Sequence, residues 1–230
     1  MMNRMQSNAR ALVLFSSLSM PLLAQSSDLS VIGTITPRAC TPTISDGGVI
    51  DYQTIDPALL SADAYTALAE QTADFSISCS APAKVAVRAI NGRANTLAGA
   101  TEGVSGFARA PVPLLDGLWG AAGLGLNGTA KIGGFTAAYD ASTLIADGAA
   151  VRTLYSTNSG GSWRISTGDL FSSTVAMVIG FAASGTTTPI AFTNLSGTLR
   201  VQAYINKTSE LDLTSAITLD GLVTLELIYP

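Results

Sequence analysis

The segment DLSVIGTITPRAC, residues 28–40, has the spacing of a β-strand followed by a cysteine. Its alternate positions, which would share one face of a strand, are Leu29, Val31, Gly33 and Ile35. Pro37 ends the run because proline cannot donate a backbone hydrogen bond to a sheet. A strand so close to the start of a chain must pair either with its own domain or with another molecule, and this choice is the main question that the sequence raises.

Residues 1–24 have the features of a secretion signal. Arg4 and Arg10 precede an apolar stretch over residues 11–23, and Ala24 offers a small residue for cleavage. The stretch is shorter than the roughly 20 apolar residues that span a bilayer. We therefore expect a cleaved signal peptide, with a membrane anchor or a buried terminal helix as the alternatives. Cleavage removes two arginines and no acid, which changes the formal net charge from −4 to −6 and argues against a nucleic-acid partner.

The composition indicates a folded domain that is exported. The 230 residues are 47% hydrophobic and only 12% charged, so the chain can bury a core. Both cysteines, Cys40 and Cys79, follow the predicted signal and would reach an oxidising compartment, where one disulfide is the simplest outcome. Metal binding is the alternative, although the chain has no histidine and no second cysteine pair.

Several short alternating runs predict an all-β fold. TADFSISCS (72–80) and AKVAVRAIN (83–91) alternate apolar and polar positions, and we expect a turn between them at Ala81 and Pro82. GGVIDYQTI (47–55) predicts another short strand, and Asp56 followed by Pro57 predicts a helical turn. Further strands are predicted over residues 173–183 and 196–206. Short strands with frequent turn signals are typical of an antiparallel β-sandwich.

The last nine residues, LVTLELIYP (222–230), predict a strand that runs almost to the end of the chain. Its alternate positions are Val223, Leu225, Leu227 and Tyr229. Chain ends usually fray unless something holds them. Both ends of the exported chain therefore have the pattern of strands that require partners.

Catalytic motifs are weak or absent in the sequence. Without histidine the chain has no His-based triad or base, and we predict no enzyme activity, no cofactor and no metal site. GLGLNG (123–128) matches a dinucleotide-binding pattern, but no helix is predicted after it to hold a pyrophosphate. Trp119, Tyr155 and Trp163 are candidates for a sugar-stacking platform, with core or edge packing as the alternative.

Taken together, the two ends of the chain resemble a known family. An alternating extension precedes Cys40, Cys79 ends the strand DFSISC, and the chain closes on VTLELIYP with a penultimate tyrosine. The chain thus resembles subunits of bacterial chaperone–usher fimbriae. The resemblance implies an incomplete immunoglobulin-like antiparallel β-sandwich over residues 38–230, the pilin fold, preceded by a donor-strand extension over residues 25–37.

The resemblance also implies roles for the residues at each end. The donor residues are Leu29, Val31, Gly33 and Ile35, which would enter a groove of a neighbouring subunit by β-strand addition. The strand that pairs with a periplasmic chaperone contains Val223, Leu225, Leu227 and Tyr229. Cys40 and Cys79 match the family disulfide. The implied partners are the chaperone, an outer-membrane usher and neighbouring pilus subunits, and the implied destination is the cell surface after passage through the periplasm.

The sequence departs from the family pattern in two places. Many pilins have a glycine fourteen residues from the end, where this chain has Ile217, and the chain ends on Pro230. The first functional hypothesis is a structural fimbrial subunit that polymerises by donor-strand exchange and supports adhesion. The second is a self-complemented or tip-type binding module whose receptor would be a host glycan or protein.

Overall fold

We describe residues 30, 32 and 39–230 of a computed structural model. The chain divides into two units, Met1–Thr36 and Pro37–Pro230, and the fold below is that of the second unit. The predicted signal peptide over residues 1–24 lies outside the described residues, as do the four proposed donor residues Leu29, Val31, Gly33 and Ile35. No helix in the described part of the chain is long and apolar enough to cross a membrane.

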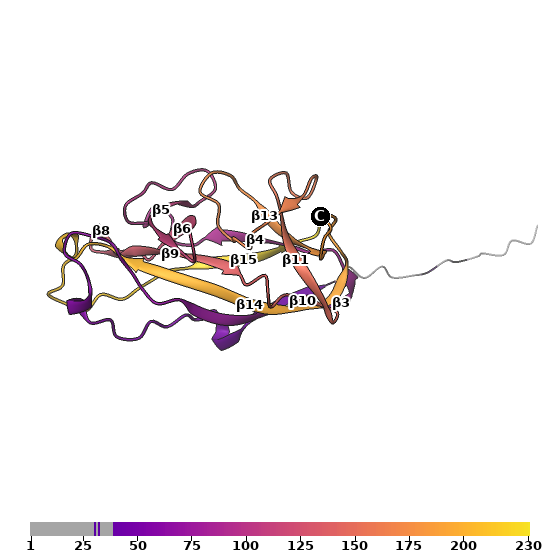
Figure 1. Cartoon of the computed structure of the whole chain (residues 1–230), viewed down its shortest axis with the longest axis horizontal. Helices are drawn as coiled ribbons and strands as arrows, with labels where there is room; N and C mark the ends of the chain where they lie inside the picture. The colour runs from indigo at the N-terminus through magenta and orange to yellow at the C-terminus, as the bar shows by residue number, and fades with distance from the viewer. Residues whose placement is uncertain (1–29, 31, 33–38) are drawn as a thin grey trace, which may run out of the picture. The chain divides into compact units, whose positions relative to one another are not determined.

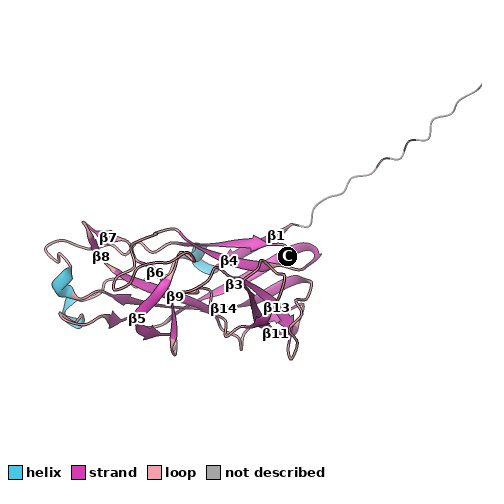
Figure 2. Cartoon of the chain, turned by 90° about the horizontal axis from the view of Figure 1, so that it is seen from above, coloured by secondary structure: helices cyan, strands magenta, loops and turns pink. Residues whose placement is uncertain are grey.

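The described residues form β-strands joined by turns, as predicted (Figure 1). The strands are β1 (Cys40–Ile44), β2 (Thr66–Ala67), β3 (Gln71–Ala83), β4 (Ala86–Asn91), β5 (Ala108–Leu114), β6 (Leu118–Gly123), β7 (Leu126–Asn127), β8 (Ala130–Lys131), β9 (Gly133–Tyr139), β10 (Ile145–Ala146), β11 (Ala149–Ser156), β12 (Arg164–Ile165), β13 (Val178–Ala183), β14 (Phe192–Ile205) and β15 (Val223–Ile228). The helical segments within residues 39–230 are single 3₁₀ turns, drawn in cyan in Figure 2: η1 (Ser45–Gly48), η2 (Pro57–Leu59) and η3 (Thr208–Glu210).

The ladders between these strands are antiparallel, and most of them form two connected groups, consistent with a β-sandwich; β2 pairs with β14, and β7 and β8 pair only with each other among the described residues. One group has the order β1-β3-β14-β9-β6-β5, and the long strand β14 is its centre (Figure 1). The other has the order β15-β4-β13-β11, with β12 beside β11. The two-residue strand β10 pairs with both β11 and β14, and so joins the groups into one continuous sheet.

The main hydrophobic core lies between the two groups of strands. Phe181 of β13 contacts Tyr139 of β9 and Phe192 of β14, with ring centroids 5.6 and 5.9 Å apart. Phe75 of β3 contacts Tyr139 at 5.2 Å. These four aromatic side chains are almost completely buried. Because they bridge strands of both groups, they fix the packing of one layer on the other.

The strand β3 continues through the predicted turn at Ala81 and Pro82, so that prediction was wrong. The chain instead reverses between Ala83, the last residue of β3, and the start of β4. The pairing of β3 with β14 is irregular between Phe192 and Asn194, opposite this part of β3. Proline is tolerated in a sheet at such a bulge, because the regular ladder is interrupted there.

The predicted strand over residues 47–55 does not form, whereas the helical turn after Asp56 does. Asp56 accepts a hydrogen bond from the backbone N–H of Ala58 at 2.9 Å and caps the 3₁₀ turn η2. Residues 49–55 have no regular secondary structure. A strand requires a hydrogen-bonded neighbour, and among the described residues this segment borders a groove instead.

Candidate functional site

An apolar groove runs between the segment that contains β1 and the segment that contains β15. Its inner section has a volume of about 430 Å³ and its outer section about 540 Å³, and both sections are lined by Val49, Ile50, Tyr52 and Leu219. The floor of the inner section consists of side chains that are buried in or packed against the hydrophobic core: Ala73, Phe135, Ala137, Leu170, Phe171, Leu199 and Val201. The groove therefore lies directly on core side chains, most of which keep less than a tenth of their surface exposed.

The strand β15 forms one wall and leaves one of its edges unpaired within the described structure. It pairs with β4 alone, from Val223 opposite Asn91 to Ile228 opposite Ala86. The N–H of Gly92 donates to the carbonyl of Leu222 at 2.8 Å. Since hydrogen-bonding groups alternate along an antiparallel strand, the backbone groups of Val223, Leu225 and Leu227 point away from β4. These are the three residues whose side chains pack against the core.

The strand β1 forms the opposite wall and offers fewer backbone donors. Ser80 donates its N–H to the carbonyl of Ala39 at 2.9 Å, so the alternation directs the backbone groups of Cys40, Pro42 and Ile44 away from β3. Pro42 has no N–H, and proline is a common device for protecting an exposed strand edge. An added strand would therefore pair more readily with β15 than with β1.

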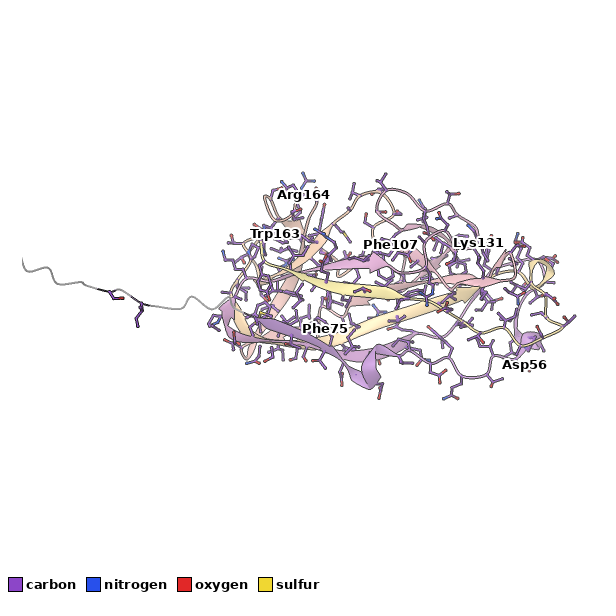
Figure 3. The ribbon with its side chains drawn as sticks, turned by 180° about the vertical axis from the view of Figure 1, so that it is seen from behind. Asp56, Phe75, Phe107, Lys131, Trp163 and Arg164 are labelled. Carbon is purple, nitrogen blue, oxygen red and sulfur yellow. A yellow bond between two sulfur atoms is a disulfide. The ribbon has the colours of Figure 1, made fainter. Side chains whose placement is uncertain are left out.

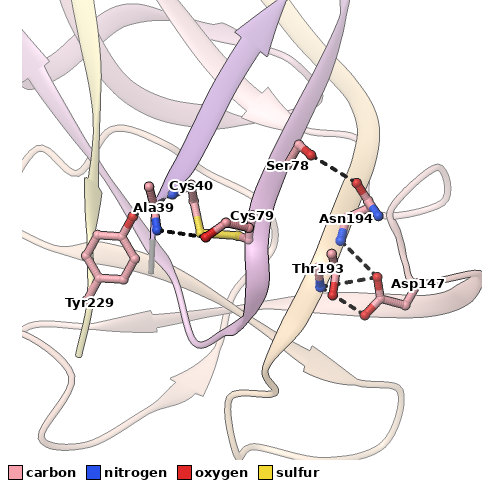
Figure 4. The surroundings of a disulfide bond; sticks show 9 residues. Ala39, Cys40, Ser78, Cys79, Asp147, Thr193, Asn194 and Tyr229 are labelled. Atoms are coloured by element: carbon pink, nitrogen blue, oxygen red, sulfur yellow. Dashed lines mark hydrogen bonds between the residues drawn. A yellow bond between two sulfur atoms is a disulfide. The ribbon is translucent and has the colours of Figure 1, made fainter. Parts of the chain in front are cut away.

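The two walls meet at one end of the groove. Cys40 donates its backbone N–H to the hydroxyl of Tyr229 at 3.0 Å. On its other side Cys40 forms a disulfide with Cys79, which confirms the predicted bridge and joins β1 to β3. Figure 4 shows the tyrosine ring and the disulfide on opposite sides of the β1 backbone. We call the Tyr229–Cys40 hydrogen bond the Tyr229 clasp.

At the other end of the groove, the wall residue Tyr52 is hydrogen-bonded to β14. The N–H of Ala203 donates to the hydroxyl of Tyr52 at 3.1 Å, and burial raises the pKa of this tyrosine. The outer section continues to Pro57. Figure 3 places the neighbouring residue Asp56 at one end of the domain and Trp163 at the other. Gly160 lies against both Trp163 and Pro230, so the closed end of the groove is at the Trp163 end.

The chain segment that leads into β15 is tied to the rest of the domain by an ion pair. The guanidinium group of Arg93 donates to both carboxylate oxygens of Asp220, at 2.6 and 2.7 Å. This hydrogen bonding lowers the pKa of Asp220 below its ordinary value of 3.8. The N–H of Asp220 also donates to the carbonyl of Leu124 at 2.9 Å. The groove wall at residues 219–222 thus has fixed attachments outside β15.

The remaining outer edge of the first layer is β5, which contains Pro111 and Pro113. Within the described residues β5 pairs with β6. Two prolines on an edge strand disfavour the addition of another strand. Of the edges of β1, β5 and β15, that of β15 contains no proline and lies beside the groove.

The structure brings one predicted set of site residues to the groove. Val223 and Leu225 line it, Leu227 packs on the core beside it, and Tyr229 closes its end with half of its surface exposed. Their predicted role in binding a chaperone is not tested by these positions. Sequence reasoning missed the core residues of the floor and the Arg93–Asp220 pair, because neither has a local sequence signal.

The candidate sugar-binding aromatics do not form a shared site in the described part of the structure. Trp163 packs over Gly180 of β13, where a methyl group would lie 2.6 Å from the indole ring. Tyr155 lies on β11 and packs against the main core. Trp119 belongs to β6 in the other layer, and its side chain is outside the description. Residues 39–230 also contain no cluster of three side chains suited to a metal ion.

Comparison with known proteins finds a family model that matches part of the chain and a relative that is similar along most of it. A family model described as "Protein of unknown function (DUF1120)" matches residues 29–110. The chain is 29% identical over 225 residues to Protein GltF of Escherichia coli (strain K12), covering 88% of this chain and 87% of that protein. No solved structure matches significantly. The matched family region includes the alternating N-terminal run and both cysteines.

Proposed function

We propose that this protein is a structural subunit of a chaperone–usher fimbria that polymerises by donor-strand exchange. The single observation that carries the proposal is the groove, whose floor consists of core side chains and which lies beside the unpaired edge of β15. Such an edge invites the addition of a strand from another chain. In β-strand addition the backbone bonds supply affinity, and the alternate side chains fill pockets.

The strand order supports a fold that lacks one strand. The order β1-β3-β14-β9 and the pair β4-β15 have the arrangement expected of an immunoglobulin-like sandwich without the final strand beside β15. On this proposal the missing strand is supplied first by a periplasmic chaperone and then by the extension of a neighbouring subunit. The disulfide is consistent with passage through an oxidising compartment on the way to the cell surface.

The alternating run at the N-terminus has a suitable length and chemistry for the groove. Residues 29–35 contain no charged side chain, and fully extended they span about 20 Å. Burial of the side chains of Leu29, Val31 and Ile35 contributes about 5–9 kcal/mol before the cost of ordering the segment. Gly33 suits a point where the groove is shallow.

Periplasmic co-expression tests the proposal. The full precursor is produced with and without a chaperone of the chaperone–usher class, then analysed by pull-down and size exclusion. We expect a one-to-one complex, and aggregation or degradation without the chaperone. A matched chain with Leu225→Asp, which puts a charge on the inner wall of the groove, should lose the complex, whereas Ile165→Asp on the exposed strand β12 should keep it. A stable monomer that ignores the chaperone contradicts the proposal.

A further inference from the structure

The group of strands β15-β4-β13-β11 has one face on the hydrophobic core and one face turned outward. Val87 of β4 and Ile179 of β13 are opposite each other in the ladder, and both pack in the core. Side chains of successive residues in a strand point to opposite faces. The neighbouring residues Ala86, Gly180 and Leu154, which are also opposite one another, therefore form a row on the outer face.

This outer row is apolar and lies under an aromatic ring. At its two ends it continues to Ile228 of β15, opposite Ala86, and to Ile165 of β12, opposite Leu154. Ala86 and Leu154 are completely buried, although they lie on the outer side of the sheet. Trp163 packs over the glycine of the row, where an added β-carbon would lie 2.6 Å from the indole ring. The indole is itself partly exposed, so it presents an aromatic surface above the row.

Trp163 is held in this position by the hydrogen-bonded loop that precedes it. The hydroxyl of Ser156 accepts from the backbone N–H of Gly160 at 2.9 Å. The side-chain oxygen of Asn158 accepts from the backbone N–H of Ser162, also at 2.9 Å. A ring that is already fixed loses little conformational freedom when a ligand stacks on it, which favours binding.

Positive charge is concentrated in this layer, although the whole sequence has 12 basic and 16 acidic residues. The strands of the layer contain one acidic residue, Glu226, whereas their basic residues are Arg88, Arg152 and Arg164, and Lys84 lies just before β4. Lys84, Arg152 and Arg164 form no ion pair within the described structure, and Arg88 approaches Glu226 only to 3.6 Å. Figure 3 shows Trp163 and Arg164 together at one end of the domain.

Three of these basic residues lie on the outer face, on both sides of the apolar row. Lys84 and Arg88 are two positions before and after Ala86 along the chain, and Arg152 is two positions before Leu154. Residues two positions apart in an extended strand share a face. Lys84 and Arg88 are thus about 13 Å apart along the strand direction, with the row under Trp163 between them.

The arrangement matches the chemistry of a polymer of acidic sugars. The guanidinium and ammonium groups offer charge-assisted hydrogen bonds to carboxylates. The indole offers a surface on which the apolar side of a sugar ring stacks. A compact phosphate would use the cations without the ring. We propose that the outer face binds an acidic polysaccharide, whose carboxylates contact Lys84, Arg88 and Arg152 and one of whose sugar rings stacks on Trp163. This inference does not depend on the groove or on the proposed function.

The test measures binding of the chain over residues 25–230 to polygalacturonic acid, a polymer of acidic sugars, by isothermal titration calorimetry. We expect affinity that falls as salt is added, because salt screens contacts between exposed charges. The double variant Lys84→Gln and Arg152→Gln should bind about fivefold more weakly. The matched control, Lys131→Gln with Lys207→Gln, neutralises two cations on β8 and beside η3 and should bind as the unsubstituted chain does.

A second variant tests the aromatic ring. Trp163→Leu keeps an apolar side chain over Gly180 and removes the stacking surface, so we expect about fivefold weaker binding. Thermal unfolding by circular dichroism checks that this variant is folded. If it is not, the exposed charge variant still decides the question, because its substitutions lie outside the core.

The choice of polymer separates the proposal from its rivals. Neutral dextran should not bind, and binding equal to that of polygalacturonic acid would overturn the role of charge. Equal affinity for polyglutamic acid, or for vesicles of an anionic phospholipid, overturns the assignment of a polysaccharide in favour of an acidic protein or a membrane surface. Absence of binding to polygalacturonic acid overturns the proposal, as does an affinity that the charge variant or a folded Trp163→Leu leaves unchanged.

Discussion

Arg93 and Asp220 are 127 residues apart in sequence, and two parallel hydrogen bonds join their side chains beside the groove. The pair joins the segment before β15 to the turn that follows β4. The carboxyl group of Asp220 is more acidic in the folded protein than its ordinary pKa of 3.8, because the guanidinium group stabilises its charged form. Its contribution to stability is therefore fully present above pH 3.8 and is lost as the pH falls through the lowered pKa.

Replacement of the ion pair should make the groove wall less stable in a pH-dependent way. We expect Arg93→Ala to lower the melting temperature slightly at pH 7 and to have a smaller effect in acid, where Asp220 is protonated in both proteins. Thermal unfolding followed by circular dichroism at several pH values measures this difference. Lys84→Ala, at an exposed lysine before β4, is the control. If Arg93→Ala lowers the melting temperature by the same amount at every pH, the ion pair with Asp220 is not the source of the loss.

Removal of the hydroxyl group should change the unfolding free energy differently at two buried tyrosines, Tyr139 and Tyr204. The hydroxyl of Tyr139 has no hydrogen-bond partner among the described residues, and burial raises its pKa. The hydroxyl of Tyr204 donates to the carbonyl of Ala98 at 2.5 Å. We expect Tyr139→Phe to be neutral or stabilising and Tyr204→Phe to cost about 1–3 kcal/mol of unfolding free energy. Urea unfolding measures the unfolding free energy of each variant. A larger loss for Tyr139→Phe than for Tyr204→Phe would contradict the structure.

The disulfide should be a major source of stability. Cys40 and Cys79 close a loop with a sequence separation of 39, for which chain entropy predicts a contribution of about 4 kcal/mol. We expect the double variant Cys40→Ala and Cys79→Ala to lose about 2–4 kcal/mol in urea unfolding. Treatment of the unsubstituted protein with a reductant should give the same loss. A difference below about 1 kcal/mol would show that the bridge does not constrain the unfolded chain as this model requires.

A larger residue at Gly221 should obstruct the groove. Gly221 lies on the groove lining, where an added β-carbon would be 2.8 Å from the ring of Phe135. Gly221→Val should weaken strand binding at least tenfold, which corresponds to about 1.4 kcal/mol. Titration of the protein with a synthetic peptide of residues 28–36 measures this change. Gly103→Val, at a glycine with no described atom within 4 Å of the added carbon, should bind as the unsubstituted protein does.

Much of the strand pattern could be predicted from the sequence, because alternation reports directly which side chains of a strand are buried. The runs that became β3, β14 and β15 alternate, and in β3 the residues Phe75, Ile77 and Cys79 are all buried. The disulfide was also predictable, since the two cysteines of the chain have one possible pairing with each other. By contrast, alternation over residues 49–55 predicted a strand that does not form, since pairing depends on a neighbour that the local sequence does not specify.

The groove itself could not be read from the sequence. Its floor combines residues from several strands, such as Phe135 of β9 and Val201 of β14, with Phe171 from a loop. Their proximity is set by the packing of the layers, which local patterns do not encode. The Tyr229 clasp likewise joins residues 189 positions apart. The penultimate position of Tyr229 is visible in the sequence, but nothing in the sequence indicates that its hydroxyl bonds to the backbone of Cys40.

Backbone amide exchange at β15 tests the central claim most directly. In the isolated chain over residues 25–230, the amides of Val223, Leu225 and Leu227 point away from β4 and should exchange faster than those of Thr224 and Glu226, which face β4. Residue-resolved exchange by nuclear magnetic resonance is measured before and after addition of a peptide of residues 28–36. The account predicts that the three fast amides become protected when the peptide binds. Unchanged exchange at these three amides in a saturating excess of peptide would contradict the claim that β15 accepts an added strand.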